Sequence, residues 1–391
     1  MTFPRLSDIP EEVLEIARSL AAAGYEVWCV GGALRDHLLG NPHTDYDLAT
    51  SARPEDVQRL FRRTAAIGIR HGTVGVIDRR RIMHEVTTFR RDVSTDGRHA
   101  VVEYGVSLDD DLARRDFTIN ALAYHPLRGE WRDPFDGAGD LAQGVVRAVG
   151  DPAERFREDY LRILRALRFA ARFGFTIHPD TWAAALEAVE GLRRLSAERV
   201  HDEWFKGLDT ARDPAELVRL WRASGAAGIW LPELEEPAAS AEAAAQPRDP
   251  ARLTVLYTSD PVAVLRRLRS SNEEIGRATA MVAGPAAPEG AGEMEARRWL
   301  ARVGDAADDL IAMHRLGQGA EPAWAEGVLR VRQRGDPVSR AQLAIGGGEL
   351  QSLGVTGPRI GELLAALLER VLDDPRLNTR DTLLALAREM V

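Results

Sequence analysis

The amino-acid sequence predicts an α+β protein, with a mixed α/β domain at the N-terminus followed by helical domains. Three observations support this class. Short apolar runs bounded by glycine and polar turns, which are typical of strands, are concentrated before residue 107. From about residue 107 onward, apolar residues recur with the spacing of amphipathic helices. A chain of 391 residues is also too long for one ordinary hydrophobic core, which predicts two to four domains.

The composition is that of a globular protein with an acidic balance. The 60 aspartates and glutamates exceed the 51 lysines and arginines, which gives a formal net charge of −9 at pH 7. Bulk charge therefore does not favour a nucleic-acid partner, although phosphate binding depends on a local basic patch rather than on the sum. Lys206 is the only lysine, so the positive charge is almost entirely guanidinium, which binds phosphate bidentately. A high genomic G+C content gives the same arginine bias.

No segment of the sequence indicates secretion or membrane insertion. Cys29 is the only cysteine, so the chain forms no internal disulfide, and its place in an apolar run predicts a packed thiol rather than a catalytic one. The N-terminus lacks a basic segment followed by an apolar run, and no stretch of about 18 apolar residues occurs. We therefore expect a soluble cytoplasmic protein.

The N-terminal part is expected to alternate helices and strands. A helix is predicted over residues 7–24, with Ser7 or Asp8 as its cap and Gly24 as its stop. A strand, a double-glycine turn, a helical turn and a second strand follow within residues 28–50. The pattern then predicts a helix at 54–61, strands at 67–77 and 82–89 joined by the polar turn 78–81, and a mobile loop at 90–105 around Asp96-Gly97.

The rest of the chain is predicted to be nearly all-α. Pro- and Ala-rich tracts at 237–250 and 284–292 are expected to be exposed loops between helical bundles, and no fixed-period repeat is visible. Helical patterns lie at 109–124, 152–173, 180–190, 196–209, 213–226, 260–270, 294–303, 306–315, 321–333, 338–345, 357–372 and 378–388.

Residues 28–50, WCVGGALRDHLLGNPHTDYDLAT, contain the first candidate site. Gly31 and Gly32 follow an apolar strand and precede a helical turn, where glycine lets backbone N–H groups approach an anion closely. Arg35 lies one turn further on and is placed to reach the same phosphates. The alternative is a tight structural turn in which Arg35 pairs with a nearby acid.

Two aspartates, Asp45 and Asp47, lie one residue apart on the second strand. Because side chains alternate between faces along a strand, both carboxylates point the same way and Tyr46 points to the other face. Like charges held this close repel unless a cation lies between them, which predicts a Mg²⁺ site. Together with a glycine turn and an arginine, such a site indicates phosphoryl or nucleotidyl transfer. Glu85 is a third acidic ligand if its strand lies alongside, and otherwise a solvated strand charge.

Residues 112–124, LARRDFTINALAY, place polar side chains among apolar ones that are expected to be buried. Arg114, Arg115, Asp116 and Asn120 therefore need polar partners. A ribose hydroxyl and a triphosphate would satisfy them, and so would salt bridges within the protein. Spacing alone does not separate these two readings.

Residues 151–174 have the clearest helix ends in the sequence. Asp151 is a cap, Pro152 occupies the first helical position and Gly174 follows the last turn, which predicts one helix. A charged stripe recurs along it every three residues, and most such stripes are solvated, salt-bridged faces. The stripe consists of Asp159, Arg162, Arg165 and Arg168.

The stripe also has a sharper reading, in which it selects nucleotide bases. An aspartate that accepts from an exocyclic amino group, beside an arginine that donates to a ring acceptor, matches the Watson–Crick edges of cytosine and adenine. Uracil and guanine present the opposite pattern and would leave both side chains unpaired, which costs more than a missing contact. Asp159 and Arg162 are the candidates for this pair.

The order of these motifs resembles one known family. Six segments in the first 210 residues, and a seventh near the C-terminus, are similar to the class II, or bacterial-type, tRNA nucleotidyltransferases and their poly(A) polymerase relatives. The likeness returns at 346–388, whereas 210–340 carries no motif that we recognise. The segments are GGALRDHLLG with TDYDLAT, IGIRHGTVGVI, EVTTFR with DGRH, DLARRDFTINALAY, DPFDGAGDL, EDYLRILRALRF and LQSLGVTGPRIGELLAALLERVLDDPRLNTRDTLLALA.

The resemblance implies a polymerase-β-like nucleotidyltransferase head, with a small mixed sheet and helices, followed by all-α neck, body and tail domains. The implied reaction is the addition of CMP and AMP to the 3′ end of tRNA from CTP and ATP, with Mg²⁺ as cofactor. The implied partners are the tRNA acceptor stem and the two nucleotides, without a protein partner or a membrane. The implied domains are a head at 1–140, a nucleotide-selecting neck at 141–210, a body at 211–335 and a tRNA-binding tail at 336–391.

Matched by position, the family's functional residues fall on the candidates above, and the attacking group is the 3′-hydroxyl of the tRNA. Asp45 and Asp47 are the implied catalytic metal ligands. The implied nucleotide-binding residues are Gly31, Gly32 and Arg35 at the triphosphate, Arg115 and Asp116 at the triphosphate and ribose, Asp159 and Arg162 at the base, and Arg165 and Arg168 supporting the base or phosphates.

Other functions on the same scaffold stay open. An enzyme that adds only the terminal A, and works with a separate CC-adding enzyme, would carry all these motifs. Members that add only CC are typically shortened before the RRDFTIN motif, whereas residues 86–111 are full length here, which argues that A addition is possible. A poly(A) polymerase is expected to have a more basic C-terminal extension. A non-catalytic RNA-binding protein would have no physical reason to keep Asp45 and Asp47 together.

One further motif is set aside. Some family members carry a C-terminal HD phosphohydrolase domain, and residues 200–203 contain an HD dipeptide. No second set of spaced histidines and aspartates accompanies it, so residues 200–203 are expected to be helix surface.

Overall fold

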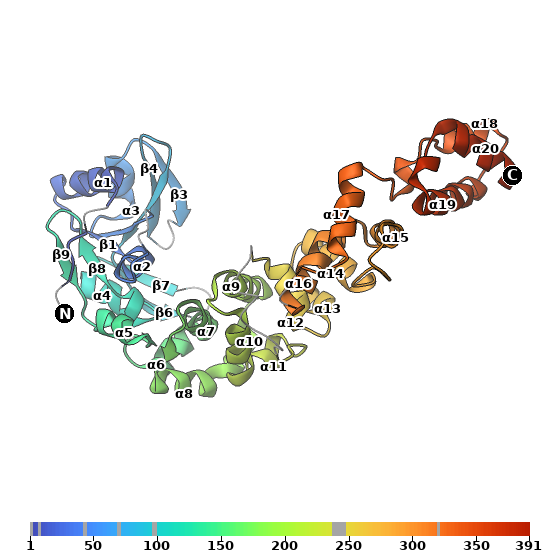
Figure 1. Ribbon diagram of the computed structural model, residues 1–391. Coiled ribbons are helices and arrows are strands. Elements are labelled where there is room, and N and C mark those ends of the chain that lie inside the picture. Colours follow the sequence, from blue (N-terminus) through green and yellow to red (C-terminus); the bar gives the residue numbers. More distant parts are fainter. Residues whose placement is uncertain are drawn as a thin grey trace. The chain divides into compact units, whose positions relative to one another are not determined.

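The structure is a computed structural model, and it describes residues 3–6, 9–41, 45–68, 72–95, 100–236, 248–318 and 321–391. The chain divides into two compact units, residues 1–236 and residues 237–391 (Figure 1). This division is coarser than the four domains that the resemblance implies.

A seven-stranded sheet forms the N-terminal part of the first unit (Figure 1), in the order β3-β4-β5-β2-β1-β8-β9. The pairing of β2 with β5 is parallel, and the other pairs in this sheet are antiparallel. The small mixed sheet expected for the head is therefore confirmed. The strands are β1 (Val27–Val30), β2 (Asp47–Thr50), β3 (Thr64–Gly68), β4 (Thr73–Ile77), β5 (Met83–Thr88), β8 (Ala123–His125) and β9 (Glu130–Arg132).

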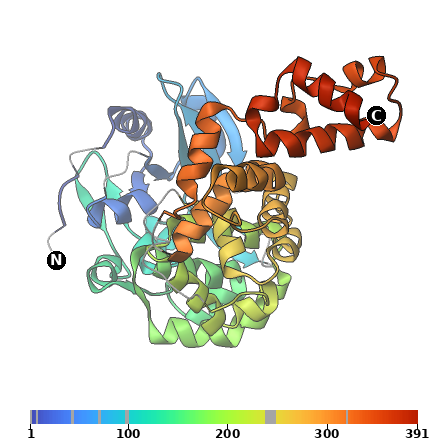
Figure 2. The same ribbon diagram turned by 45° about the vertical axis from the view of Figure 1, so that its right-hand side comes forward.

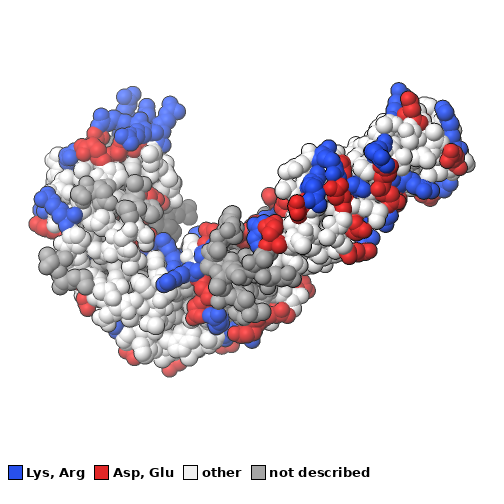
Figure 3. Space-filling view, viewed as in Figure 1, with Lys and Arg blue, Asp and Glu red and all other residues white. Residues whose placement is uncertain are grey.

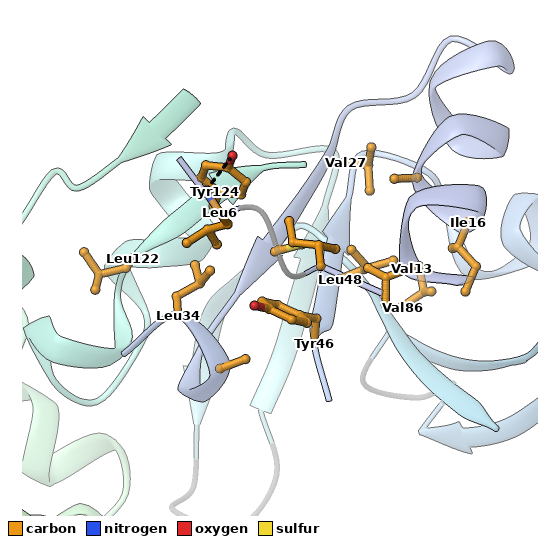
Figure 4. Close-up of a cluster of buried hydrophobic side chains, with 14 of the residues drawn as sticks. Leu6, Val13, Ile16, Val27, Leu34, Tyr46, Leu48, Val86, Leu122 and Tyr124 are labelled. Carbon is orange, nitrogen blue, oxygen red and sulfur yellow. Dashed lines mark hydrogen bonds between the residues drawn. The ribbon is translucent and has the colours of Figure 1, made fainter. Parts of the chain in front are cut away.

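The residues from Asp45 to Leu48 alternate between surface and core as expected, and the rest of β2 is buried on both faces. Tyr46, directly before the strand, and Leu48 are fully buried in the core (Figure 4), whereas Asp45 and Asp47 are exposed. Asp47 pairs with Val30 at the end of β1. The sheet therefore places the carboxylate of Asp47 beside the glycine turn that follows β1.

The core of the sheet domain is built from apolar side chains of strands and of helices that pack on the sheet. Burying one such side chain contributes about 1.5 to 3 kcal/mol. The helices are α1 (Glu11–Ala22), α2 (Gly32–Leu38) and α3 (Pro54–Leu60). Figure 4 shows the cluster, which includes Leu6, Val13, Ile16, Val27, Leu34, Tyr46, Leu48, Val86, Leu122 and Tyr124.

The structure tests two predictions near the N-terminus, the start of the first helix and the burial of Cys29. Helix α1 begins at Glu11 rather than at residue 7, because Pro10 is its N-cap, and Ser7 and Asp8 lie outside the described residues. Cys29 is fully buried in β1, as expected for a packed thiol. Burial raises the pKa of that thiol, and the nearby Asp47 carboxylate raises it further.

Two strand predictions were wrong. Residues 67–77 belong to two antiparallel strands, β3 and β4, rather than to one. Residues 90–105 were expected to be a loop, but they contain the antiparallel pair β6 (Arg90–Thr95) and β7 (Ala100–Tyr104), with residues 96–99 outside the described part. An Asp-Gly pair between β-branched residues is a hairpin signal, which the many charges in this segment obscured.

The helix predicted at 109–124 was wrong beyond residue 113. This segment forms helix α4 (Leu108–Ala113), a 3₁₀ turn η2 (Thr118–Asn120) and strand β8, which pairs with β1. The apolar residues expected to be buried do enter the core, but they do so from a turn and a strand. A short apolar run does not distinguish a buried strand from a helix by periodicity alone.

The single helix predicted over 152–173 is two helices, α6 (Pro152–Glu158) and α7 (Leu161–Phe173). Both predicted ends are confirmed. The carboxylate of Asp151 accepts a hydrogen bond from the Ala153 N–H at 2.8 Å, and Gly174 ends α7 with a φ of +67°.

The break between the two helices falls at Asp159. Its backbone is extended, with φ −155° and ψ 104°. Its carboxylate accepts a hydrogen bond from the Leu161 N–H at 3.0 Å. An aspartate that bonds the backbone two residues further on competes with the helix in this way and starts a new one. Asp159 therefore lies at a helix break rather than on a regular stripe.

The helical part of the first unit is organised around α7, which packs against α9 and α10 (Figure 1). The rings of Trp204 and Trp221 meet edge to face between α9 and α10, with centroids 5.2 Å apart. The elements here are α5 (Gly137–Gln143), the parallel strands β10 (Val145–Val146) and β11 (Thr176–Ile177), α8 (Pro179–Ala188), the 3₁₀ helix η3 (Val189–Arg194), α9 (Ala197–Thr210), α10 (Pro214–Ala223) and α11 (Ala226–Trp230).

The second unit contains helices and no strand among its described residues. The helical class expected here is confirmed, but residues 338–345 hold only the 3₁₀ turn η5 (Arg340–Gln342). The last three helices share a separate core (Figure 2). The helices are α12 (Pro250–Tyr257), α13 (Pro261–Arg267), α14 (Asn272–Ala283), α15 (Glu293–Val303), α16 (Ala307–Gln318), α17 (Ala325–Arg334), α18 (Gly347–Ser352), α19 (Pro358–Asp373) and α20 (Arg380–Met390), with short turns η4 (Gly304–Ala306) and η6 (Pro375–Leu377).

The expected loop at 284–292 contains no helix or strand, and most of the one expected at 237–250 lies outside the described residues. Among the helices that the structure describes, none has both the length and the apolar character needed to cross a membrane.

Candidate active site

A cavity of about 530 Å³ opens in the first unit, between the glycine turn and helix α7. Its lining comes from α2, β2, the segment after α4, and helices α7 and α9, which are far apart in the sequence. Every implied catalytic or nucleotide-binding residue except Asp45 lines it, and the candidate ligand Glu85 does not. The lining residues are Gly31, Gly32, Arg35, Asp47, Arg114, Arg115, Asp116, Asn120, Asp159, Leu161, Arg162, Arg165, Arg168, Phe169, Arg172 and Arg199.

Gly31 is required both by its backbone and by its surroundings. Its φ is +81°, in the left-handed region that side chains disfavour. A Cβ atom there would lie 3.3 Å from Nη1 of Arg115 and 3.6 Å from Oδ2 of Asp47. Glycine therefore keeps the turn open between a guanidinium and a carboxylate.

The two aspartates suit a metal that is shared with a substrate. Asp47 lines the cavity and Asp45 precedes it on the same face. Within the described part of the chain, no three acidic, histidine or cysteine side chains gather into a metal-binding group. Strand β5, which carries Glu85, does lie beside β2, so a role for Glu85 as a third ligand stays a prediction. Mg²⁺ takes six oxygen ligands and is commonly held by one or two carboxylates plus phosphates and water. Two carboxylates fit that pattern.

Arg35 is held on several sides. It is only 4% exposed, and burial lowers the pKa of its guanidinium. Nε donates to Asp36 at 2.9 Å and Nη1 donates to the Asn120 side chain at 2.6 Å. The guanidinium also lies 5.2 Å from the ring centroid of Phe169 and 4.8 Å from that of Phe173. Pairing with a nearby acid, the alternative raised by the sequence, is therefore present, while Arg35 still faces the cavity.

Asp116 joins the head segment to helix α7. Its Oδ1 accepts from the Phe117 N–H at 2.8 Å and from Asn120 at 3.0 Å, and its Oδ2 accepts from Nε of Arg165 at 2.8 Å. Burial opposes the charged form of Asp116, but the guanidinium of Arg165 and the hydrogen bonds outweigh it and lower the pKa of this carboxyl. Asp116 is therefore a buried carboxylate that stays ionised.

Arg114 and Arg115 are both held by Asp111, which is almost fully buried. Arg114 donates to Oδ1 of Asp111 at 2.8 Å, and Arg115 approaches Oδ2 at 3.4 Å. Arg115 also donates to the Asn120 carbonyl at 3.3 Å. The salt-bridging alternative for this segment is thus realised within the protein. The same contacts hold both guanidinium groups at the edge of the cavity.

The two candidates for base selection face the cavity but have partners in the protein. Oδ2 of Asp159 accepts from Arg199 on α9 at 2.7 Å. Arg162 donates to Glu158 at 2.6 Å and to the Arg114 carbonyl at 3.0 Å. A base that formed hydrogen bonds with both side chains would replace some of these contacts within the protein.

Arg168 is anchored by a buried acid that the sequence reading placed on the surface. Glu203 is 5% exposed, and Arg168 donates to it at 2.6 Å. The expectation that 200–203 is helix surface is therefore wrong for Glu203 and for the fully buried Val200, whereas Asp202 is exposed. A carboxylate on the apolar side of a helix is buried when a cation from another helix meets it.

Arg172, Arg199 and Phe169 also line the cavity and were missed from the sequence. Arg172 lies one helical turn beyond Arg168, so the spacing of α7 carried a signal for it. Arg199 contacts Asp159 from a separate helix, and residue spacing within one segment does not predict a contact between two segments.

Figure 3 shows basic side chains gathered at several places on the visible face of the first unit, two of which bear on the site and the sheet. One lies near β7 and α9. The other lies at the outer end of β4, where the turn to β5 carries the consecutive arginines at 79–81. Positive charge is therefore concentrated locally although the whole chain is acidic.

The fold and the cavity define a class of enzyme. A mixed sheet presents a carboxylate beside a glycine turn, and arginines from the next helices face the same space. Residues 27–147 match the family described as "Poly A polymerase head domain", and residues 174–236 match "Probable RNA and SrmB- binding site of polymerase A". The protein is a nucleotidyltransferase.

Known relatives identify the family within the nucleotidyltransferases. The chain is 35% identical over 413 residues to the CCA-adding enzyme of Lactiplantibacillus plantarum, an alignment that covers 98% of each chain. It is 47% identical over 208 residues to the CCA-adding enzyme of Levilactobacillus brevis, where the aligned stretch covers 52% of each chain. The chain belongs to the CCA-adding enzyme family of tRNA nucleotidyltransferases.

Solved structures agree with this assignment. The CCA-adding enzyme of Bacillus stearothermophilus in complex with CTP matches with a TM-score of 0.81 and 32% identity, over 97% of both chains. The CCA-adding enzyme of Thermotoga maritima complexed with tRNA matches with a TM-score of 0.65 over 98% of this chain and 97% of that one. At 22% identity, the second match supports the fold alone. The fold implied by the sequence motifs is confirmed.

Proposed function

We propose that this protein adds CMP and AMP to the 3′ end of tRNA, using CTP and ATP, and so completes or repairs the CCA terminus. The observation that carries the proposal is the single cavity that joins Asp47 and the glycine turn to Asp159 and Arg162. One side of this cavity suits phosphate chemistry and the other suits recognition of a base. The relatives' names and the bound CTP of the Bacillus stearothermophilus enzyme agree with it.

In this proposal Asp45 and Asp47 hold Mg²⁺. The ion would neutralise the triphosphate and favour ionisation of the attacking 3′-hydroxyl. The open backbone at Gly31 and Gly32 gives the phosphates a close approach that a side chain would block. The negatively charged oxygens of the leaving pyrophosphate would contact guanidinium groups rather than apolar side chains.

The arginines and Asp116 orient the nucleotide. Arg35 and Arg115 are held in fixed positions by protein partners, so little conformational entropy is lost when they bind phosphate. Asp116 and Asn120 present a hydrogen-bonded pair that a ribose hydroxyl can join. Arg165 and Arg168 support the base or the phosphates from α7.

Asp159 and Arg162 select the base. Cytosine and adenine both offer an amino donor and a ring acceptor, which suit a carboxylate and a guanidinium. Guanine and uracil present a carbonyl and a ring N–H, which would leave both protein groups unpaired in a partly enclosed site. In the structure Arg199 and Glu158 occupy these two groups, so an incoming base displaces charged partners and must match them well.

The proposal extends to the rest of the chain. We assign residues 1–140 to the head, 141–210 to the neck, 211–335 to the body and 336–391 to the tail that contacts the tRNA acceptor stem. Since the proposed substrates are tRNA and free nucleotides, the proposed location is cytoplasmic. Restriction to terminal A addition is the second candidate, because such an enzyme needs the same base-selecting pair.

One experiment separates these functions. Purified protein is given tRNA transcripts that end either before CCA or in CC, with Mg²⁺ and CTP, ATP or both, and the 3′ ends are read at single-nucleotide resolution. Extension of both substrates is expected for CCA addition. Extension of the CC substrate alone would identify an A-adding enzyme, long A tracts would identify a poly(A) polymerase, and no extension would refute enzymatic activity.

A further inference from the structure

Tyr160 lies directly after Asp159, in the break between α6 and α7, and its ring covers Gly191 of η3. A Cβ atom on Gly191 would lie 2.0 Å from Cε1 and 2.1 Å from Cδ1 of Tyr160. Real Cβ atoms do not approach a neighbour within 3.0 Å. The Arg194 guanidinium also lies over this ring, 5.6 Å from its centroid. Only glycine fits at position 191 beneath the ring.

Gly191 is fixed by its neighbour. Leu192 is fully buried, and its carbonyl accepts hydrogen bonds from Nε1 of Trp230 at 2.9 Å and from the Leu195 N–H at 3.1 Å. These contacts tie η3 to α11 and to the core. A side chain added at Gly191 would therefore displace the ring of Tyr160 rather than move η3.

The backbone of Tyr160, which carries the ring, is itself part of the break between α6 and α7. Asp159 bonds across Tyr160 in two ways: its carboxylate accepts from the Leu161 N–H at 3.0 Å, and its carbonyl accepts from the Arg162 N–H at 3.1 Å. Both bonds depend on the backbone of Tyr160. A displaced ring would pull on the connection that sets where the Asp159 carboxylate points.

We infer that Gly191 and Tyr160 form a positioning pair that fixes Asp159 for base selection. Neither residue lines the active-site cavity. They lie instead on a separate hollow of about 440 Å³ together with Arg157 and Arg194. The inference rests on the proposed function, because it requires that Asp159 reads the base. It adds two residues to the specificity of the site without giving them a contact to the nucleotide.

A double-mutant cycle tests the pair. The variants are Gly191→Ala, Tyr160→Ala and the two combined, with Gly228→Ala as control, because Gly228 lies in α11 with nothing within 4 Å of its added Cβ. Each is assayed for kcat/KM with CTP, ATP, GTP and UTP on tRNA transcripts, and for thermal melting. Base preference is the ratio of kcat/KM for CTP or ATP to kcat/KM for GTP or UTP.

Gly191→Ala is expected to lower the base preference at least about 10-fold, as a mispositioned polar contact does. Tyr160→Ala alone is expected to lower it about 2- to 5-fold, since Asp159 keeps its other bonds. The combined variant is expected to match Tyr160→Ala, because the added methyl group no longer meets a ring. Gly228→Ala is expected to behave like the unaltered protein.

Two results would overturn the pair while leaving the proposed function intact. One is an unchanged base preference in Gly191→Ala. The other is an equal effect of Gly191→Ala with and without the ring of Tyr160. If Gly191→Ala does not fold, Tyr160→Phe and Tyr160→Ala decide the matter, because the first keeps the ring and should keep full selectivity. A protein that accepts all four nucleotides before any substitution would refute the proposed function itself.

Discussion

The carboxylate of Asp116 and the guanidinium of Arg165 are 2.6 Å apart, although they come from the head segment and from helix α7. Asp116 is 9% exposed, and the Arg165 side chain is 33% exposed. The pair couples the part of the site that would hold the ribose and phosphates to the helix that carries Arg162, the arginine proposed to read the base. Its strength therefore bears on both stability and activity.

This pair makes stability fall in acid. The folded protein holds the pKa of Asp116 below its ordinary value, so its contribution is complete above about pH 4, the unfolded pKa, and is lost as pH falls through the lower folded pKa. We expect urea unfolding between pH 5 and pH 2.5 to show a smaller loss of stability with acidification in Asp116→Asn than in the unaltered protein. An identical pH dependence in the two proteins would argue against a paired Asp116.

Removing the cation leaves a buried charge. We expect Arg165→Ala to lower the free energy of unfolding at pH 7 by about 2 kcal/mol, less than the 3 to 5 kcal/mol of a fully buried pair, because Arg165 is partly solvated. Arg193→Ala is the matched control, since Arg193 forms an exposed pair with Glu190 and should change stability by about 0.5 kcal/mol or less. Chemical denaturation of both variants measures the difference.

Asp47→Ala is expected to abolish addition of every nucleotide, by at least about 1000-fold in kcat, since the metal loses a ligand beside the triphosphate. Binding of tRNA, measured by filter retention, should change little. Asp202→Ala removes the same charge from an exposed position in the same unit and should keep full activity. Residual addition above a few per cent in Asp47→Ala would refute its assignment as a metal ligand.

Arg162→Ala is expected to relax base choice while incorporation continues. Loss of one base contact should lower the preference for C and A over G and U by about 10- to 100-fold. Arg162 also bonds the carbonyl groups of Arg155 and Arg114, so thermal melting is needed to show that the variant is folded. A folded variant with unchanged selectivity would contradict the assignment.

Gly31→Ala should damage nucleotide binding more than folding. The added Cβ would lie 3.3 Å from Arg115, and a φ of +81° disfavours alanine by about 1 kcal/mol. We expect KM for CTP and ATP to rise several-fold with little loss of secondary structure. Gly40→Ala is a control for the backbone cost alone, because Gly40 also has a positive φ and nothing within 4 Å of its added Cβ.

Local sequence patterns predicted features that depend on a few neighbouring residues. The alternation of Asp45, Tyr46 and Asp47, the glycine turn, and the ends of the segment from Asp151 to Gly174 follow from side-chain periodicity and capping. These are the features that the structure reproduces.

Features that depend on contacts between distant segments were not predicted. Asp159 lies at a break because its carboxylate bonds the backbone locally, an option that competes with a helix and leaves no mark in the spacing. Glu203 is buried because Arg168 of another helix neutralises it. The strand pair at 90–95 and 100–104 was not predicted, because charged residues interrupt the apolar pattern expected of strands.

The break between α6 and α7 also bears on how the chain tolerates change in length. Each residue added to a continuous helix rotates everything beyond it by about 100°. Because the two helices are separate and α7 is packed against α9 and α10, an insertion or deletion early in α6, before Arg155, would be absorbed without turning Arg162 and Arg165 away from the cavity. The same change within the first turns of α7 would turn the arginines away. Natural length variation among homologues should therefore be found before residue 155 and not between 161 and 168.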